Sequence, residues 1–241
     1  MKIRLDKYLA DMGLGTRSQI KKEIRSGQVV VNGISICRPE VKIDTGQDKV
    51  IFHGEPVTYE EYEYFMLNKP AGVISAASDR QETTVIDLIK DRKRDNLFPV
   101  GRLDKDTEGL LIITNNGELA HRLLSPKKHV DKVYFARING QVTQSDVDIF
   151  SRGVDIGDEK PTLPADLVIC TSDEVSEIRL TIREGRFHQV KRMFQAVGKE
   201  VVYLKRLRMG GITLDESLKP GEYRRLTEEE VERLCSQERK P

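Results

Sequence analysis

The sequence contains no tryptophan, few aromatic residues and only three cysteines, and each shortage narrows what the chain can be. Aromatic residues make up 6% of the 241 residues, so we expect a core built mostly from aliphatic side chains. Cys37, Cys170 and Cys235 lie far apart without metal-ligand spacing, which favours free thiols in a reducing compartment. We therefore expect a cytoplasmic protein.

Long apolar runs and an excess of either charge are also absent. No stretch approaches the ~20 apolar residues of a membrane helix, and the N-terminal residues lack the apolar core of a signal peptide. We expect no membrane partner. Lys and Arg (40) nearly balance Asp and Glu (39), so the net charge of +1 does not by itself indicate a class of partner. The length suffices for one large domain or two modest ones.

Motifs of several enzyme classes are missing as well. The sequence has no GxGxxG after a strand, no GxxxxGK[ST] and no GxSxG elbow, and its four histidines show no metal-ligand pairing. What remains is carboxylate chemistry without a metal, and we expect no cofactor. The best-placed carboxylates are Asp104 and Asp106.

Both carboxylates lie in a charged stretch, PVGRLDKDTEGLLIITNNG, which spans residues 99–117. The apolar run 110–113 predicts a buried strand, and Asn115-Asn116-Gly117 predicts the turn that ends it. Charged residues placed next to the start of a buried strand lose hydration, which costs free energy. Such residues therefore indicate a function at this position. A solvated loop before a core strand is the alternative interpretation.

Residues 1–60 form a separate unit in the pattern, with a polar linker at about 55–63 and a second domain over 64–241. We expect helices over 5–12 and 16–27, a hairpin over 29–36 with a type I′ turn at Asn32-Gly33, and a further strand pair at 41–43 and 50–52. Arg17, Lys21 and Arg25 recur every four residues and therefore share one helix face. The motifs RLDKYL, TRSQ and GQVVVNG resemble the S4 RNA-binding module. The resemblance implies that this basic face contacts RNA phosphates.

The second domain reads as many short strands with a few inserted helices, which predicts an α+β fold on a mostly antiparallel sheet. We expect strands at 64–67, 110–113, 132–138, 167–170, 178–182, 201–204 and 212–214, and helices at 83–90, 118–124, 144–150, 188–197 and after 227. Residues 183–208 are rich in Lys and Arg, as a phosphate-binding cleft requires. On the helix in this segment, Lys191 and Arg192 flank the apolar stripe, so one can point into the domain while the other faces out.

The stretch GRLDKDTEGLLIITNNG, followed by KVYFARI, EGRFHQVKRMFQAVG and GGITL, resembles the RsuA-type pseudouridine synthases, which isomerise a uridine in bacterial ribosomal RNA. The resemblance spans nearly the whole chain and implies a mixed, mostly antiparallel sheet with a central cleft. It assigns the catalytic aspartate to Asp104, the tyrosine that packs against the target base to Tyr134, and the basic partner of the aspartate to Lys191, where many relatives have Arg. It places Leu204 in the base pocket and leaves Asp106 as a turn or capping residue.

The reaction that this family carries out fits these residue types. Uracil leaves its N-glycosidic bond, turns and rejoins the ribose through carbon, so one ionised carboxylate suffices, as a nucleophile or as a base. The base must be flipped out of its stack. Contacts of phosphates with Arg102, Arg186, His188 and Arg192 would offset that cost.

We therefore predict a pseudouridine synthase that acts on 16S ribosomal RNA, with a monomer as the default state. The small-subunit assignment rests on the similarity of residues 184–198 and 210–227 to that subgroup. A 23S ribosomal RNA substrate and a non-catalytic S4-type RNA-binding protein are the alternatives. A glycosidase with two carboxyls ~5 Å or more apart is less well supported, because Asp104 and Asp106 share one short loop.

Overall fold

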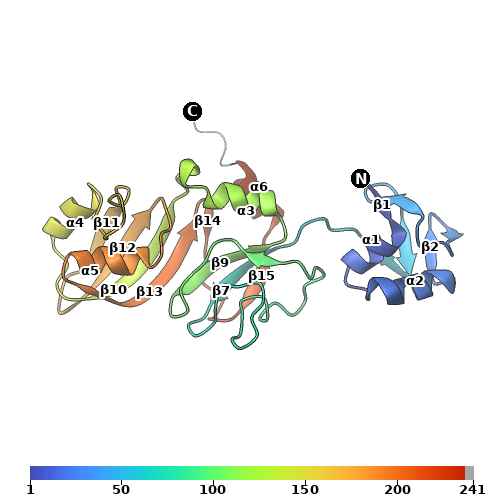
Figure 1. Cartoon of the computed structure of the whole chain (residues 1–241), viewed down its shortest axis with the longest axis horizontal. Helices are drawn as coiled ribbons and strands as arrows, with labels where there is room; N and C mark the ends of the chain where they lie inside the picture. Colours follow the sequence, from blue (N-terminus) through green and yellow to red (C-terminus); the bar gives the residue numbers. More distant parts are fainter. Residues whose placement is uncertain (237–241) are drawn as a thin grey trace. The chain divides into compact units, whose positions relative to one another are not determined.

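The computed structural model describes residues 1–236 and divides the chain into two units. The first unit contains residues 1–63 and 90–97, and the second contains residues 64–89 and the chain from 98 onward. Figure 1 shows their elements. The elements of the first unit are β1 (Lys2–Arg4), α1 (Leu5–Asp11), α2 (Arg17–Arg25), β2 (Val29–Val31), β3 (Ile34–Ser35), β4 (Lys42–Asp44), β5 (Val50–Phe52) and β6 (Glu55–Val57).

Local sequence signals account for most of the first unit. Thr16 and Gln19 form the predicted capping box at the start of α2. Asn32 and Gly33 both have positive φ (51° and 83°), which confirms the type I′ turn between β2 and β3. The predicted pairing of the next two strands is wrong, because β4 pairs with β1 while β5 pairs with β2 and β6. Strand propensity was visible in the sequence, but the choice of partner is a long-range property.

The segment expected to be a linker, at about 55–63, is partly structured and packs within the first unit. Residues 55–57 form β6 beside β5. Farther along, the Tyr59 hydroxyl donates to Asp11 at 3.1 Å, and the Arg94 guanidinium lies 4.9 Å from the Tyr59 ring centroid. Arg94 is buried and its Nη1 lies 3.1 Å from Asp11 Oδ2. Residues 90–97 therefore join the first unit, although they are distant from it in sequence.

The second unit is a nine-stranded sheet within the described residues, in the order β11-β12-β10-β13-β9-β7-β15, with β14 on β13 and β8 on β9. Every pairing is antiparallel except that of β9 with β13, which confirms the mixed, mostly antiparallel sheet. Its elements are β7 (Tyr64–Lys69), β8 (Phe98–Pro99), β9 (Glu108–Thr114), α3 (Gly117–Leu124), a 3-10 helix η1 (Pro126–Lys128), β10 (Lys132–Asn139), α4 (Gln144–Phe150), β11 (Asp166–Thr171), β12 (Val175–Ile182), α5 (Gln189–Ala196), β13 (Glu200–Met209), β14 (Ile212–Thr213), β15 (Tyr223–Arg225) and α6 (Glu228–Ser236).

The helix predicted over residues 83–90 does not form. Val85, Ile86 and Ile89 are buried as expected, but the segment folds as tight turns, with Asp87 N donating to Thr84 O and Ile89 N to Ile86 O. The Asp87 carboxylate accepts from both the backbone N–H and the hydroxyl of Thr84. The first residues of the segment are extended instead, because Thr84 forms a parallel bridge with Ile74, in which Val85 N donates to Ile74 O. The residues that remain are too few for a helix.

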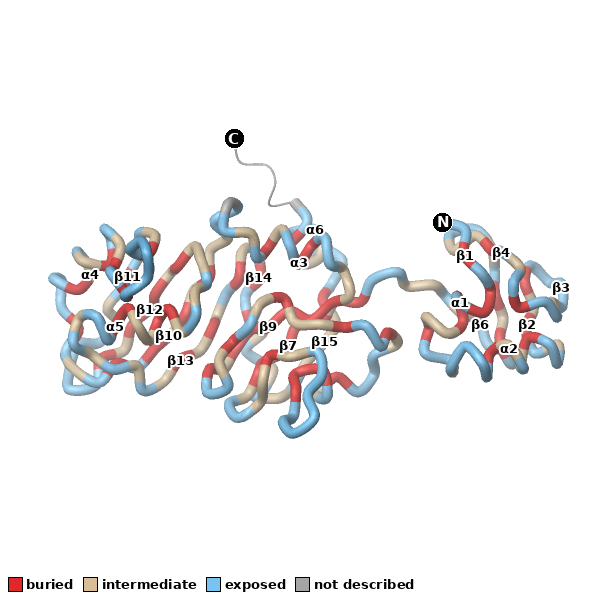
Figure 2. The backbone as a smooth tube through the Cα atoms, viewed as in Figure 1, coloured by how far each residue is buried: buried red, intermediate tan, exposed pale blue. Residues whose placement is uncertain are grey.

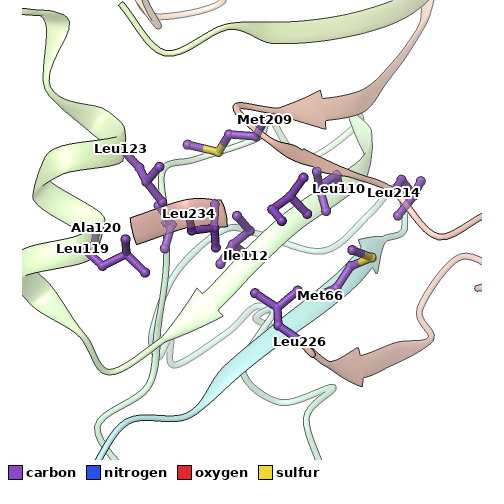
Figure 3. Close-up of a cluster of buried hydrophobic side chains, with 12 residues drawn as sticks. Met66, Leu110, Ile112, Leu119, Ala120, Leu123, Met209, Leu214, Leu226 and Leu234 are labelled. Carbon is purple, nitrogen blue, oxygen red and sulfur yellow. The ribbon is translucent and has the colours of Figure 1, made fainter. Parts of the chain in front are cut away.

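The core of this unit explains why β7 and β9 read as apolar runs. Both strands are buried along nearly their whole length (Figure 2). Helices α3 and α6 cover one face, where Leu119 and Leu123 of α3 and Leu234 of α6 pack with Met66 and Ile112 (Figure 3). In the other half of the sheet, Phe150 of α4 and Phe194 of α5 meet at 4.9 Å between ring centroids.

The parallel pairing of β9 with β13 joins the two halves of the sheet at a glycine. Gly109 has φ of +101°, and a Cβ built on it would lie 2.3 Å from the Arg206 carbonyl oxygen. No larger side chain fits this approach. The joint brings the loop that precedes β9 close to β13 and to its neighbour β10, where the predicted site residues lie.

Candidate active site

Asp104 lies in a turn between β8 and β9, with its side chain 26% exposed. The turn is closed by a hydrogen bond from Thr107 N to Asp104 O at 3.0 Å. Just before it, Ser75 Oγ donates to the Leu103 carbonyl at 2.8 Å and accepts from the Leu103 N–H at 3.0 Å. The carboxylate therefore stands on a backbone that is fixed from both sides.

Lys69, at the end of β7, also fixes this turn. Its role was not predicted from the sequence. Its side chain is fully buried, and its Nζ donates to the carbonyls of Pro70 (3.0 Å), Asp104 (3.0 Å), Lys105 (3.2 Å) and Thr107 (2.9 Å). Burial lowers the pKa of Lys69 to about 8, against the opposing charges of Asp106, Asp104 and Glu108. The available signal was a single lysine inside an apolar strand, directly before Pro70.

Lys191, on α5, lies between two carboxylates. Its Nζ is 3.3 Å from Asp104 Oδ2, and it donates to both oxygens of Asp106 at 2.6 and 2.8 Å. The predicted partnership of Lys191 with Asp104 thus includes Asp106, which is a turn residue and also the closer ion-pair partner. Burial alone would lower the pKa of Lys191, but the hydrogen bond with Asp106 and the charges of both aspartates raise it. Because its pKa is raised, Lys191 stays protonated at neutral pH. Lys191 in turn lowers the pKa of Asp106.

A pocket opens above Asp104 and collects most of the predicted residues. Tyr134 of β10 and Leu204 of β13 are buried in its wall, and His188 lies with its Nε2 3.7 Å from Asp104 Oδ1. The Thr107 hydroxyl is buried at the pocket and has no hydrogen-bond partner among the described residues. The lining residues are Arg102, Leu103, Asp104, Thr107, Tyr134, Ile182, Gly185, Arg186, His188, Gln189, Val190, Lys191 and Leu204.

Arg186 and Arg192 are bound to the loop over residues 156–161, which the sequence did not indicate. Arg186 donates to the carbonyls of Lys160 (2.6 Å) and Pro161 (2.8 Å), and Arg192 donates to that of Ile156 at 2.6 Å. Both guanidinium groups also reach the Asp158 carboxylate, at 3.4 Å and 2.6 Å respectively. Lys191 therefore points to the pocket and Arg192 away from it, as their positions beside the apolar stripe allowed.

The basic face of the first unit is organised by a buried acid. Asp6 is fully buried and lies 2.9 Å from Arg4, 3.4 Å from Arg17 and 3.9 Å from Lys21. Burial alone would raise the pKa of Asp6, but the hydrogen bond from Arg4 and the charge of Arg17 outweigh it and lower the pKa. Arg25, one helical turn beyond Lys21, is exposed on the same helix.

Comparison with known proteins matches both units to described families. The S4 domain matches residues 3–49, within the first unit, and the RNA pseudouridylate synthase family matches residues 63–196, which include the whole pocket but Leu204. This chain belongs to the RNA pseudouridylate synthase family. The predicted family and the predicted S4 domain are both confirmed, and the chain is a pseudouridine synthase of the RsuA type.

Individual members of this family resemble the chain over nearly its full length. The RNA pseudouridine synthase YtzG of Bacillus subtilis (strain 168) is 49% identical, over 96% of this chain and 98% of that protein. Ribosomal small subunit pseudouridine synthase A of Escherichia coli (strain K12) is 42% identical, over 95% of this chain and 98% of that protein. A crystal structure of a pseudouridylate synthase is 40% identical, with a TM-score of 0.68 over 96% of this chain and 99% of that one. None of the helices within residues 1–236 is long and apolar enough to cross a membrane.

Proposed function

We propose that this pseudouridine synthase converts a uridine of 16S ribosomal RNA into pseudouridine, with Asp104 as the catalytic residue. The observation that carries the proposal is the position of Asp104 in a pocket, next to Lys191 and His188 and across from the buried Tyr134 and Leu204. The similarity to ribosomal small subunit pseudouridine synthase A supports the small-subunit RNA as substrate. The reaction belongs in the cytoplasm, where ribosomal RNA is made and assembled.

The chemistry needs one ionised carboxylate and a fixed base. The bond between N1 of uracil and C1′ of the ribose breaks, the ring turns, and C5 bonds to C1′ while the C5 proton is lost and N1 gains one. Asp104 acts either as a nucleophile or as a base in this sequence. Lys191 places a positive charge 3.3 Å from the Asp104 carboxylate.

The pocket fits a flipped uridine by its mixture of surfaces. The Tyr134 ring supplies an aromatic platform, and Leu204 supplies an apolar wall beside it. The buried Thr107 hydroxyl supports a polar ligand, because a buried group without a partner is costly until a ligand provides one. A ribose hydroxyl or the edge of uracil would satisfy it.

Basic groups of both units would bind the RNA backbone. Two of them, Arg102 and His188, line the pocket itself. Arg186 and Arg192 face the Asp158 carboxylate, and an RNA phosphate has the charge to replace it. On the S4 domain, Arg17, Lys21 and Arg25 form the proposed phosphate contacts.

The decisive experiment compares two carboxylates of one turn. Asp104→Asn should abolish tritium release from ribosomal RNA that carries 5-tritiated uridine. Asp106→Asn is the matched control, since it changes the same charge beside the same lysine, and it should retain activity. Equal background release by wild type and Asp104→Asn would refute the enzymatic assignment of Asp104.

Mapping of pseudouridine by carbodiimide treatment and primer extension, in cells lacking the gene, tests the substrate. Loss of a site only in 23S ribosomal RNA would overturn the choice of 16S.

A further inference from the structure

Phe187 exposes its ring to solvent although it lies next to the pocket. Its side chain is 75% exposed, more than any other exposed large hydrophobic residue among those the structure describes. Exposure of one large apolar side chain is common by itself. Here the neighbours in sequence, Arg186 and His188, both line the pocket, while Phe187 does not.

The ring is held in place by its neighbour. The rings of Phe187 and His188 are stacked, with centroids 3.8 Å apart and planes 20° from parallel. His188 has φ of +47°, a left-handed conformation that a residue other than glycine adopts only when its surroundings impose it. The result is an aromatic pair whose inner member lies 3.7 Å from Asp104 and whose outer member faces solvent.

The backbone around Phe187 is fixed, so the exposure is not that of a loose loop. Arg192 donates to the Phe187 carbonyl at 3.2 Å, and the Gln189 side chain accepts from Arg186 N at 2.9 Å. Gln189 also donates to Glu184 at 2.9 Å. A rigid, flat, apolar surface at the rim of a nucleotide pocket is suited to stacking on a nucleobase.

We propose that Phe187 stacks on the base of the nucleotide adjacent to the target uridine, and so positions the RNA strand at the rim of the pocket. The inference rests on the proposed function, in which the target base itself occupies the pocket above Asp104. The adjacent base stays outside, where the outer face of the Phe187–His188 pair is available. Arg186 and Arg192 lie on the same segment and pair with Asp158, for which an RNA phosphate could substitute.

Steady-state kinetics on ribosomal RNA from cells lacking the gene test this role. Phe187→Ala should lower kcat/KM by about 5- to 150-fold, the range for loss of one base–aromatic stack. The change should fall on KM with kcat retained, because a neighbouring base is held alike before and during the reaction. Phe187→Tyr should behave as wild type and Phe187→Leu as Phe187→Ala. Val168→Ala, at a 58% exposed position on edge strand β11, is the matched control and should have no effect.

Fluorescence provides a second readout that does not require turnover. Because the chain has no tryptophan, Phe187→Trp and Val168→Trp each introduce a single tryptophan as the fluorescent probe. Addition of the same RNA should quench the fluorophore at position 187 and leave the one at 168 unchanged. If the wild type is active and Phe187→Ala has an unchanged KM, the proposed role of Phe187 is wrong. RNA binding without quenching of the tryptophan at position 187 would also overturn that role. An inactive wild type on every ribosomal RNA would instead refute the proposed function, and the quenching experiment would still decide whether Phe187 meets a base.

Discussion

Replacement of Lys69 by methionine removes a buried ammonium group that binds four backbone carbonyls around the Asp104 turn. Methionine has a similar length and keeps most of the packing, so the variant isolates the hydrogen bonds and the charge. Two of the carbonyls keep another donor, since Asp104 O also accepts from Thr107 N and Lys105 O from Gly72 N. The remaining loss is that of charge-assisted bonds in a buried site.

The magnitude follows from the cost of breaking such a site. A buried carbonyl left without a donor costs about 1–3 kcal/mol, so the two that lose their donor cost about 2–6 kcal/mol. Each kcal/mol lowers the Tm of a domain of this size by about 2–4 °C. We expect the Tm of Lys69→Met to fall by about 4–24 °C. A displacement of Asp104 by about 1 Å would slow the reaction roughly 100-fold. Amide hydrogen exchange at Thr107 and Gly72 should also accelerate.

The assays are thermal unfolding, hydrogen exchange at Gly72 and over residues 101–107, and tritium release below the Tm of the variant. Lys105→Met is the matched control, because that lysine lies in the same turn but is 52% exposed and pairs with Glu82. Its effect should stay within about 0.5 kcal/mol. A Tm of Lys69→Met within about 2 °C of wild type, with unchanged tritium release, would refute the idea that Lys69 holds the turn.

Three further outcomes are expected. Burial and the hydrogen bond to Glu108 raise the pKa of Tyr203 to about 12, so between pH 10 and 12 the folded chain binds more protons than the unfolded one and its unfolding free energy falls as the pH rises. Urea unfolding at pH 9 and 11 should show that Tyr203→Phe removes this decrease relative to wild type. Asp6→Asn should destabilise the S4 domain by about 1.5–3 kcal/mol at pH 7, the range for hydrogen bonds to a charged group, whereas Glu23→Gln should not. Because the pKa of Asp6 is lowered in the fold, its contribution exists above the unfolded pKa and disappears in acid, so melting curves of variant and wild type should converge there. Asp158→Asn should tighten RNA binding about 2- to 5-fold in filter-binding titrations, as expected from removal of an exposed competing anion. Weaker binding would mean that Asp158 orders the arginines for RNA instead of competing with it.

Much of the fold could be predicted from the sequence, because the local sequence signals agree with the tertiary structure. The capping box at Thr16, the Asn32-Gly33 turn and the apolar run of β9 each specify a conformation through nearby atoms alone. The family motifs likewise placed Asp104, Tyr134 and Lys191 in one site, and the structure brings all three to one pocket. The expected helix over 83–90 does not form because a bridge between Thr84 and Ile74, which periodicity does not reveal, holds its first residues extended.

The sequence by itself determined most of the helices and strands, the carboxylate turn before a buried strand and the basic character of the segment that faces it. Only the tertiary structure decided which charges meet. It placed Asp106 closer than Asp104 to Lys191, turned Arg186 and Arg192 toward Asp158, and buried Lys69 under the turn. Periodicity specifies the face on which a side chain lies. Its partner depends on which distant segment the sheet brings alongside, and here the close approach of β9 to β13 at Gly109 made that choice.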